Sequence, residues 1–502
     1  MLLILAVLLL IATFSTKVAA RFGVPGLVIF LALGMIFGSD GLNLIYFDNP
    51  VLAQQIAIAF MIIILFEGGF STKKGLLKLA FQPAFTLATL GIIITAVTLG
   101  LLSHLLIGLP LESALLIGAI VSSTDAAAVF AIFRDKSIQP KTAATLEVES
   151  ASNDPMAIIL TVAIIGFIQG GIPNPQYFII DLLWQIIAGL AIGFLVGKIA
   201  PYLFNRMQLD SGGFYYVLIL AVCFLSYSLA DELNTNGFLA VFIAGCYLGN
   251  TEFVYKQGIS RFMEGLSTFS HVMLFLMLGL LVFPSNLLNN WQHGLIIAVI
   301  LTFVARPVAV FLCTIFWKYT FKEKIFLCWG GIKGAIPIVL ATYPFVAGLE
   351  GGSYYFNVVF FVVLLSALIQ GSTIDLVAKK LGLFAGIKPR SPYSFELIAL
   401  QETKSELLEY TVDKNSWLIN QSLQDIPLPQ EILVTAIVRQ EEIVTPRGDT
   451  LIKPKDILFI LAKSAYHDDL LKLLDEGVDT IPEGLSSETE INARNANPTG
   501  DV

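Results

Sequence analysis

Apolar stretches separated by short polar gaps recur along the chain from Met1 to about Leu376. Most of them hold about 15–25 residues, enough for a helix to cross a hydrocarbon core of about 30 Å. They lie at 1–16, 24–38, 52–70, 83–105, 112–133, 143–170, 179–203, 213–230, 237–249, 265–284, 293–317, 325–347 and 354–376. This pattern predicts an all-α polytopic membrane protein with thirteen transmembrane helices.

Lysine and arginine residues fall in every second gap between these stretches. The basic gaps hold Lys17 and Arg21; Lys73, Lys74 and Lys78; Arg134, Lys136 and Lys141; Lys198 and Arg206; Lys256 and Arg261; and Lys318, Lys322 and Lys324. Because cytoplasmic loops are enriched in basic residues, we expect the N-terminus outside and the C-terminus in the cytoplasm. The first stretch lacks a preceding basic segment of the kind a secretory signal needs, so we expect it to be retained.

The composition agrees with a membrane protein, since 56% of the residues are hydrophobic, 14% are charged and the mean hydropathy is +0.79. These values exclude an ordinary soluble protein. Residues 1–392 carry 21 basic and 18 acidic residues, whereas residues 393–502 carry 9 and 20. A weakly basic membrane part with an acidic tail gives no support to nucleic-acid binding.

The hydropathy pattern changes after Lys380, where glycine and proline residues mark a linker. SFELIAL then alternates polar and apolar residues, ILVTAIV, EEIVTP and DILFILA are short β-branched runs, and a helical stretch lies near 467–474. We therefore expect four parts: a transmembrane domain at 1–380, a linker at 381–392, a small α+β cytoplasmic domain at 393–476, and an acidic, disordered tail at 477–502.

Two of the apolar stretches contain residues that interrupt helices. The twelfth stretch includes GGIKGAIP at 330–337, and the fifth includes SSTD at 122–125. Interrupted helices at related places in two halves of a membrane protein are typical of inverted-repeat transporters whose site lies at the membrane midplane. The alternative for the glycine cluster is close packing of helices, where small residues are common.

Six charged residues lie within apolar stretches: Glu67, Asp125, Glu149, Asp154, Arg306 and Lys333. An ionised side chain near the bilayer centre costs at least about 2.5–3.5 kcal/mol, so such residues usually have a function or an opposite charge beside them. At a rise of about 1.5 Å per residue, all except Glu67 and Glu149 are expected at one depth, about 10–18 Å from the cytoplasmic boundary. Four acids and two bases leave an excess of acids, which points to a cation site.

The segment from Glu149 to Asp154 presents two polar faces if it is helical. Ser150 and Asp154 are four residues apart and share one face, while Glu149 and Asn153 share the neighbouring face. The first face offers oxygen ligands for a monovalent cation or a proton, and both would compete for the Asp154 carboxylate. We therefore predict that Asp154 carries the ion. The alternative is a polar residue that only packs.

The remaining charges are predicted to be structural. Arg306 is expected to pair with Glu149, because a lone charge there would be stranded in the membrane. Asp125 and Lys333 are expected to offset the dipole ends of the interrupted helices. We interpret His271 as an interfacial histidine in preference to a pH sensor.

At these residues the chain resembles the monovalent cation/proton antiporters, in particular their electroneutral, NhaP-like branch. The resemblance rests on LFEGGF at 65–70, SSTDAAAVF at 122–130, ESASNDP at 149–155, FVARP at 303–307 and GGIKGAIPIVLA at 330–341. It implies that Asp154, Ser150, Glu67 and the carbonyl of Thr124 bind the transported cation, that Asp125 and Asn153 shape the site, and that Glu149 pairs with Arg306. It also implies one-for-one exchange from the Asn-Asp pair. The family usually has arginine where this chain has Lys333.

Residues 417–461 resemble the C-terminal half of a regulator-of-potassium-conductance (RCK) domain. Such modules commonly dimerise and bind small regulators, sometimes nucleotides. The glycine-rich dinucleotide fingerprint of the other half is absent from the sequence.

Together these features predict a homodimeric antiporter of a bacterial inner membrane that exports K⁺, or Na⁺ or NH₄⁺, in exchange for H⁺ and so serves cation, pH or volume homeostasis. We expect neither an enzyme activity nor a cofactor; the partners are these ions, membrane lipids and a regulator of the C-terminal domain. The alternatives are a Na⁺-selective exchanger, whose selectivity would depend on fine cavity geometry, and an RCK-regulated cation channel.

Overall fold

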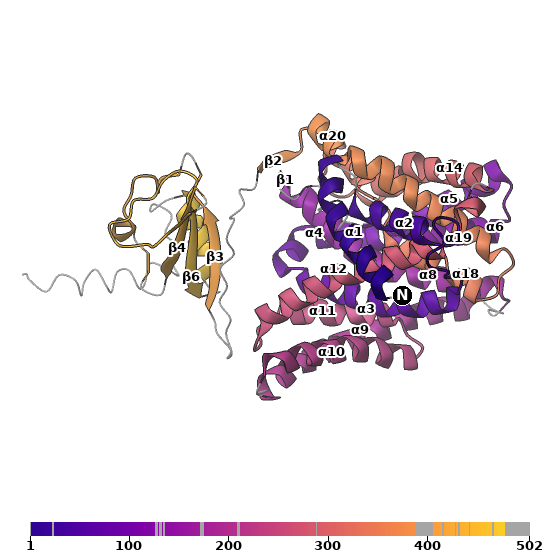
Figure 1. The fold of residues 1–502 in the computed structure, drawn as a ribbon, viewed down its shortest axis with the longest axis horizontal. Coiled ribbons are helices and arrows are strands. Elements are labelled where there is room, and N and C mark those ends of the chain that lie inside the picture. The colour runs from indigo at the N-terminus through magenta and orange to yellow at the C-terminus, as the bar shows by residue number, and fades with distance from the viewer. Residues whose placement is uncertain are drawn as a thin grey trace, which may run out of the picture. The chain divides into compact units, whose positions relative to one another are not determined.

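The computed structural model divides into two compact units, Met1–Gly386 and Ile387–Val502 (Figure 1). The described residues are 2–22, 25–125, 129, 133, 136–170, 175–207, 211–287, 289–387, 405–413, 416–426, 428–429, 432–440, 442–463 and 466–476. The predicted tail at 477–502 and the predicted strand at 394–400 lie outside them.

The first unit is almost entirely helical. Its α-helices are α1 (Leu2–Phe22), α2 (Gly26–Phe37), α3 (Pro50–Ser71), α4 (Lys74–Thr86), α5 (Ile92–Ile107), α6 (Leu111–Ile120), α8 (Pro140–Ile168), α9 (Pro175–Met207), α10 (Gly212–Glu232), α11 (Gly237–Gly249), α12 (Lys256–Leu281), α13 (Pro284–Leu287), α14 (Trp291–Ile300), α15 (Arg306–Cys313), α16 (Phe321–Trp329), α17 (Ala335–Leu340), α18 (Tyr343–Val346), α19 (Gly352–Ser366) and α20 (Ser372–Leu381). Within the described residues, eight helices are long and apolar enough to cross a membrane, and five shorter helices are also apolar.

Three of the long helices contain a π-helical turn that the apolar pattern did not predict. These turns are Leu87–Gly91 between α4 and α5, Leu301–Ala305 between α14 and α15, and Ala367–Gly371 between α19 and α20. A π-turn inserts one extra residue into a helix and is common at functional sites. The second turn directly precedes Arg306 and the third includes Gln370, so both lie beside residues of the polar interior.

The predicted interruptions are present as non-helical segments. Helix α6 ends at Ile120, and residues 123–125 have no regular secondary structure; helix α16 ends at Trp329, and residues 331–334 are likewise irregular before α17 begins. The two segments meet, because the Asp125 N–H donates to the Ile332 carbonyl at 2.7 Å. Much of the chain after Asp125 in the fifth stretch lies outside the described residues.

Close helix packing fixes the positions of the polar residues. Helices α3, α11 and α9 lie side by side (Figure 1). A Cβ atom added at Gly245 of α11 would lie 2.4 Å from the Phe66 carbonyl of α3. Only glycine allows this approach, which sets the register of α3 and therefore the place of the neighbouring Glu67.

A two-stranded sheet joins β1 (Lys136–Ile138) to β2 (Phe384–Ile387). We had expected residues 381–392 to be a linker, yet residues 384–387 form β2. The strand is possible because β1 supplies the backbone partners that an isolated linker would lack. Gln139 N–H extends the contact by donating to the Leu383 carbonyl at 3.2 Å.

The second unit contains a four-stranded antiparallel sheet in the order β3-β6-β4-β5. The strands are β3 (Ser405–Thr411), β4 (Leu433–Arg439), β5 (Glu442–Val444) and β6 (Ile457–Lys463), followed by α21 (His467–Glu476); a 3₁₀ turn lies at Leu423–Asp425. Buried Ile437, Leu458 and Leu470 belong to its core. The prediction of a helical membrane part followed by a small α+β domain is confirmed, although β3 was not among the predicted runs.

Candidate functional site

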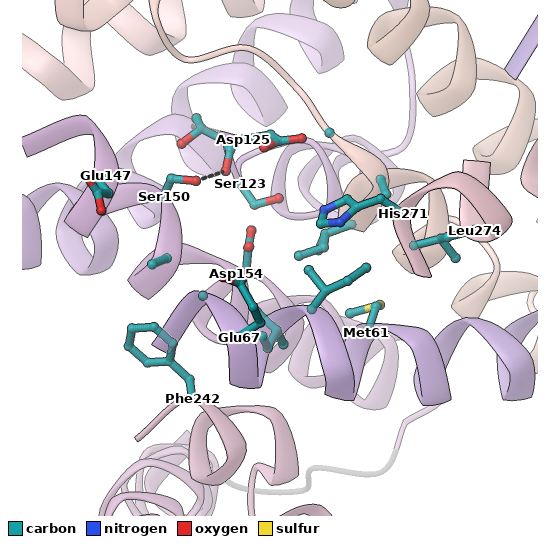
Figure 2. Close-up of a pocket in the computed structure, with 18 of the residues that line it drawn as sticks. Met61, Glu67, Ser123, Asp125, Glu147, Ser150, Asp154, Phe242, His271 and Leu274 are labelled. Carbon is teal, nitrogen blue, oxygen red and sulfur yellow. Dashed lines mark hydrogen bonds between the residues drawn. The ribbon is translucent and has the colours of Figure 1, made fainter. Parts of the chain in front are cut away.

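A cavity of about 350 Å³ lies inside the helical unit, between α3, α8, α12 and the two non-helical segments (Figure 2). About half of the residues that line it are polar and the others are apolar. The polar lining residues are Glu67, Ser71, Thr72, Ser123, Thr124, Asp125, Glu147, Ser150, Asp154 and His271. The structure thus brings Asp154, Ser150, Glu67, Thr124 and Asp125 to one cavity, as the sequence predicted. Glu147 was not predicted.

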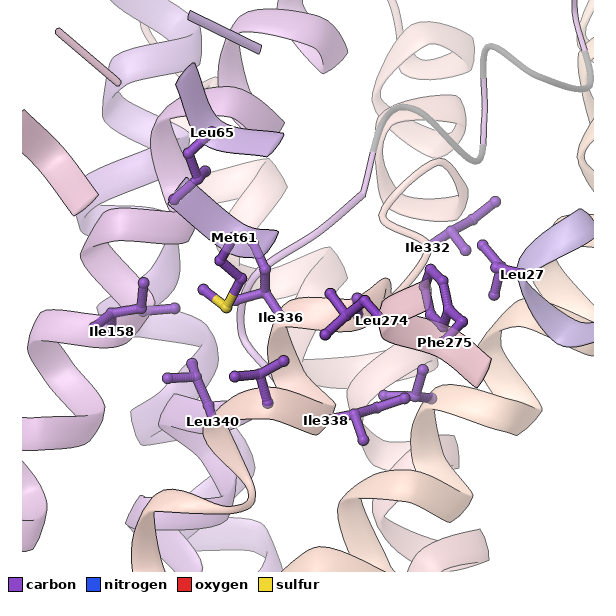
Figure 3. Packing of buried hydrophobic residues seen from close by; sticks show 14 of the residues in the cluster. Leu27, Met61, Leu65, Ile158, Leu274, Phe275, Ile332, Ile336, Ile338 and Leu340 are labelled. Atoms are coloured by element: carbon purple, nitrogen blue, oxygen red, sulfur yellow. The ribbon is translucent and has the colours of Figure 1, made fainter. Parts of the chain in front are cut away.

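The two ends of the cavity differ in polarity. One end includes Ser71 and Thr72, at the end of α3 that is followed by the basic residues after position 72. The other end is apolar and includes Met61, Leu274 and Ile336. These three belong to one buried cluster with Ile158 and Leu340 (Figure 3). Met61 precedes Glu67 by about 9 Å of helix rise, so the apolar end lies away from the basic loop.

Helix α8 supplies the central carboxylate. Asp154 is half-buried and faces the cavity, one turn after buried Ser150 on the same face (Figure 2). Pro155 follows it inside the helix and has no N–H to donate to the Ala151 carbonyl. Ala151 also lines the cavity. The carrier residue predicted from sequence therefore lies at a point where the helix backbone itself has a missing hydrogen bond.

Thr124 connects the non-helical segment at 123–125 to α8. The Ser150 hydroxyl donates to the Thr124 carbonyl at 2.9 Å, and the Asn153 amide donates to the Thr124 hydroxyl at 2.7 Å. The Thr124 N–H donates back to the Asn153 side-chain oxygen at 3.4 Å. Asn153 thus holds the segment in place, the geometry expected of a site-shaping residue. The Thr124 carbonyl and Ser150, both predicted ligands, are in mutual contact.

Glu149 and Arg306 form a buried, two-pronged ion pair. Arg306 Nη1 donates to Glu149 Oε1 at 2.5 Å, and Nη2 donates to Oε2 at 3.0 Å. The side chains are 4% exposed for the arginine and 1% for the glutamate. Arg306 also donates to the Leu327 carbonyl at 3.3 Å. The pair joins α8 to α15 and α16, on the face of α8 adjacent to that of Asp154.

Lys333 and Asp125 lie at helix ends. The Lys333 ammonium donates to the carbonyls of Ser122 and Ser123 at 3.2 and 2.9 Å, just beyond the C-terminal end of α6. A Cβ atom added at Gly334, the residue before α17, would lie 2.4 Å from Asp125 Oδ2. The positive charge therefore lies where carbonyls accumulate and the negative charge lies beside a helix start, as dipole compensation requires.

The sequence did not predict the polar network that holds the Lys333 segment. Lys333 N–H donates to the Ser366 hydroxyl at 3.1 Å, which donates to Gln370 Oε1 at 2.5 Å. The Gln370 amide then donates to the Trp329 carbonyl at 3.2 Å. Ser366 and Gln370 are polar, buried and four residues apart in the last apolar stretch. That spacing was the available signal for a paired helical face.

Glu67 and His271 have local partners. Ser71 donates to Glu67 Oε1 at 2.6 Å within α3. His271 Nδ1 lies 2.9 Å from the Ser267 carbonyl, which can only accept, so Nδ1 carries the hydrogen. In the described part of the chain, no three His, Cys, Asp or Glu residues form a group that could hold a metal ion. The acids therefore line a common cavity without being gathered into a cluster of that kind.

Comparisons with known proteins agree with this architecture. The family model described as sodium/hydrogen exchanger, transmembrane, matches residues 5–380, and the TrkA-C domain model matches residues 407–475. The chain is similar to the K(+)/H(+) antiporter NhaP of Alkalimonas amylolytica, with 37% identity over 94% of this chain and 83% of that protein. It is also similar to the K(+)/H(+) antiporter NhaP2 of Shewanella sp. strain MR-4, with 34% identity over 95% and 83%.

Among solved structures, the sodium proton antiporter MjNhaP1 from Methanocaldococcus jannaschii aligns with a TM-score of 0.67. The alignment covers 75% of this chain and 97% of that one, at 27% identity.

Proposed function

Since this chain belongs to the transmembrane sodium/hydrogen exchanger family and is a cation/proton antiporter, we propose that it exports K⁺ in one-for-one exchange for H⁺. The single observation that carries the proposal is that the Asp154 carboxylate faces the cavity. Glu149 on the same helix does not line the cavity and is neutralised by Arg306. One carboxylate that binds either a cation or a proton couples the two movements directly.

The cavity supports alternating access. Its polar end lies beside the basic loop after α3, which by the distribution of basic residues faces the cytoplasm. Its apolar end is lined by Met61, Leu274 and Ile336, which belong to the buried core. We propose that this is the inward-facing form, and that the apolar cluster opens when the site turns outward.

The membrane topology is proposed to have thirteen spans in inverted repeats, with the N-terminus outside and the C-terminus in the cytoplasm of a bacterial cell. Eight long and five shorter apolar helices in the described residues support the count. The interruptions before Asp125 and before Ala335 meet side by side, which supports the crossing of two related broken helices.

The choice of K⁺ rests on the relatives named K(+)/H(+) antiporters, whereas the structural neighbour is named a sodium proton antiporter. Na⁺ is therefore the second candidate ion, and NH₄⁺ is a further one. Reconstituted protein with a trapped pH dye separates these ions when K⁺, Na⁺, Li⁺ and NH₄⁺ are added singly. K⁺ is expected to give the lowest KM; a response to Na⁺ alone would reassign the substrate.

Asp154→Asn tests the carrier. The amide is nearly the same size as the carboxylate but can neither lose a proton nor attract a cation, so exchange is expected to vanish for every ion. The variant should still purify as folded protein, because Asp154 forms no ion pair within the described residues. Substantial exchange by folded Asp154→Asn would end the assignment.

We propose that the TrkA-C domain at 407–475 regulates this exchange in response to a small ligand or nucleotide. The two units are separately compact, which supports a control module that takes no part in the ion chemistry. A chain ending at Lys388 is expected to exchange cations for protons while its response to cytoplasmic conditions is altered. Loss of transport by that folded, truncated chain would contradict the proposal.

A further inference from the structure

The Ser123 hydroxyl is an unexplained polar group in the cavity wall. Ser123 is 1% exposed and lines the cavity; within the described part of the chain its Oγ makes no direct hydrogen bond, and the side chain that it faces is the Asp154 carboxyl. Neighbouring hydroxyls are occupied: Ser122 Oγ donates to the Ala119 carbonyl at 2.6 Å, and Ser150 Oγ donates to Thr124. Buried polar groups without partners are rare in proteins and call for an explanation.

The placement of Ser123 is specific to the cavity. The buried atoms without partners among the described residues are Ser39 Oγ, Ser103 Oγ, Ser123 Oγ, Thr161 Oγ1 and Arg306 Nε. Of these, Ser123 Oγ alone belongs to the lining that includes Asp154. Figure 2 shows the Ser123 side chain and the Asp154 carboxyl directed into the same space.

The backbone of Ser123 is held firmly while its side chain is left available. The Lys333 ammonium donates a hydrogen bond to the Ser123 carbonyl at 2.9 Å, so that oxygen already has a partner. The next residue, Thr124, is tied to α8 through Ser150 and Asn153. Anchoring on both sides fixes where the hydroxyl points and lowers the entropy that a ligand would have to remove.

We propose that the Ser123 hydroxyl oxygen is a ligand of the transported monovalent cation, in addition to the ligands already proposed around Asp154. This inference rests on the proposed function and extends its site. Hydroxyl oxygens suit alkali cations and bring no charge of their own, so the exchange of one cation for one proton at Asp154 stays balanced. When the proton replaces the cation, the hydroxyl no longer contacts a cation and only Asp154 changes its charge.

Ser123→Ala tests the ligand role in proteoliposomes of the full chain. Removing one contact to a charged partner is expected to raise the cation KM about tenfold or more. The rate at saturating cation should stay close to that of the unmodified protein, because Asp154 still carries the ion. Ser123→Cys, which keeps the shape but replaces the oxygen with a poor ligand for hard cations, should raise the KM as well, and it serves if the alanine variant does not fold.

Ser103→Ala is the matched control, because Ser103 Oγ is equally buried and without a partner but does not line the cavity. Its cation KM should be unchanged. An unchanged KM in folded Ser123→Ala or Ser123→Cys would overturn the proposal, and so would an equal rise in Ser103→Ala. Asp154→Asn is measured in parallel to distinguish failure of the proposed function from failure of the Ser123 proposal. Exchange by Asp154→Asn refutes the proposed function. An inactive Asp154→Asn together with a normal KM in Ser123→Ala refutes only the role of Ser123.

Discussion

Two carboxylates lie on neighbouring faces of helix α8 in very different surroundings. Glu149 is held by both terminal nitrogens of Arg306, and the two side chains are almost completely buried. Asp154 lies five residues later, half-buried, in the wall of a cavity with hydroxyl and carboxyl neighbours. Two carboxylates of the same helix thus differ: Glu149 is neutralised by Arg306, whereas Asp154 is placed to bind a cation or a proton from the cavity.

The difference shows how a membrane protein can keep one acid reactive and another inert. A buried ion pair fixes two helices and keeps its charges constant, because separating them would strand a charge in an apolar interior. A carboxylate in a water-accessible cavity can instead exchange a proton for a cation. Because successive residues of a helix are rotated by about 100°, Glu149 and Asp154 point to different faces of α8 and meet different surroundings.

Arg306→Met is expected to have the largest effect on the difference between the two carboxylates. It leaves Glu149 buried without its partner, which is expected to cost about 3–5 kcal/mol of stability. We expect a large fall in the apparent unfolding temperature of the purified protein and a low yield of folded chain. An Arg306→Met protein as stable as the unmodified one would show that the pair has no structural role.

The double variant Glu149→Gln with Arg306→Met is expected to have a smaller effect. Because no charge is stranded, its loss of stability should be well below that of Arg306→Met alone, and the coupling energy of the cycle measures the pair. Proteoliposomes of the double variant should still exchange ions through Asp154. Loss of exchange by a well-folded double variant would mean that Glu149 takes part in carrying the ion.

Much of the site could be predicted because charges in apolar stretches are rare enough to be conspicuous. Asp154, Asp125, Arg306 and Lys333 were expected at one depth, and the structure has Arg306 on Glu149 and Lys333 on the end of α6. The spacing of Ser150 and Asp154 likewise predicted a shared face, and both line the cavity. The ligand roles of these residues stay predictions.

The remainder depended on lateral contacts that a single sequence does not specify. Ser366 and Gln370 of the last apolar stretch hold the Lys333 backbone through hydrogen bonds, and their own sequence does not indicate that they contact Lys333. Ser123 looked like one of several small polar residues, and only the structure distinguishes its unpartnered hydroxyl from that of Ser122. The π-turns also escaped prediction, because one inserted residue barely changes an apolar pattern.

If a proton and a cation compete for Asp154, the cation KM must depend on pH. In proteoliposomes of the full chain, we expect acidification to raise the KM for K⁺ by up to about tenfold per pH unit while the maximal rate at saturating K⁺ stays constant. A KM that does not change with pH, or a maximal rate that falls with acid and is not restored by more K⁺, would contradict competition at one carboxylate.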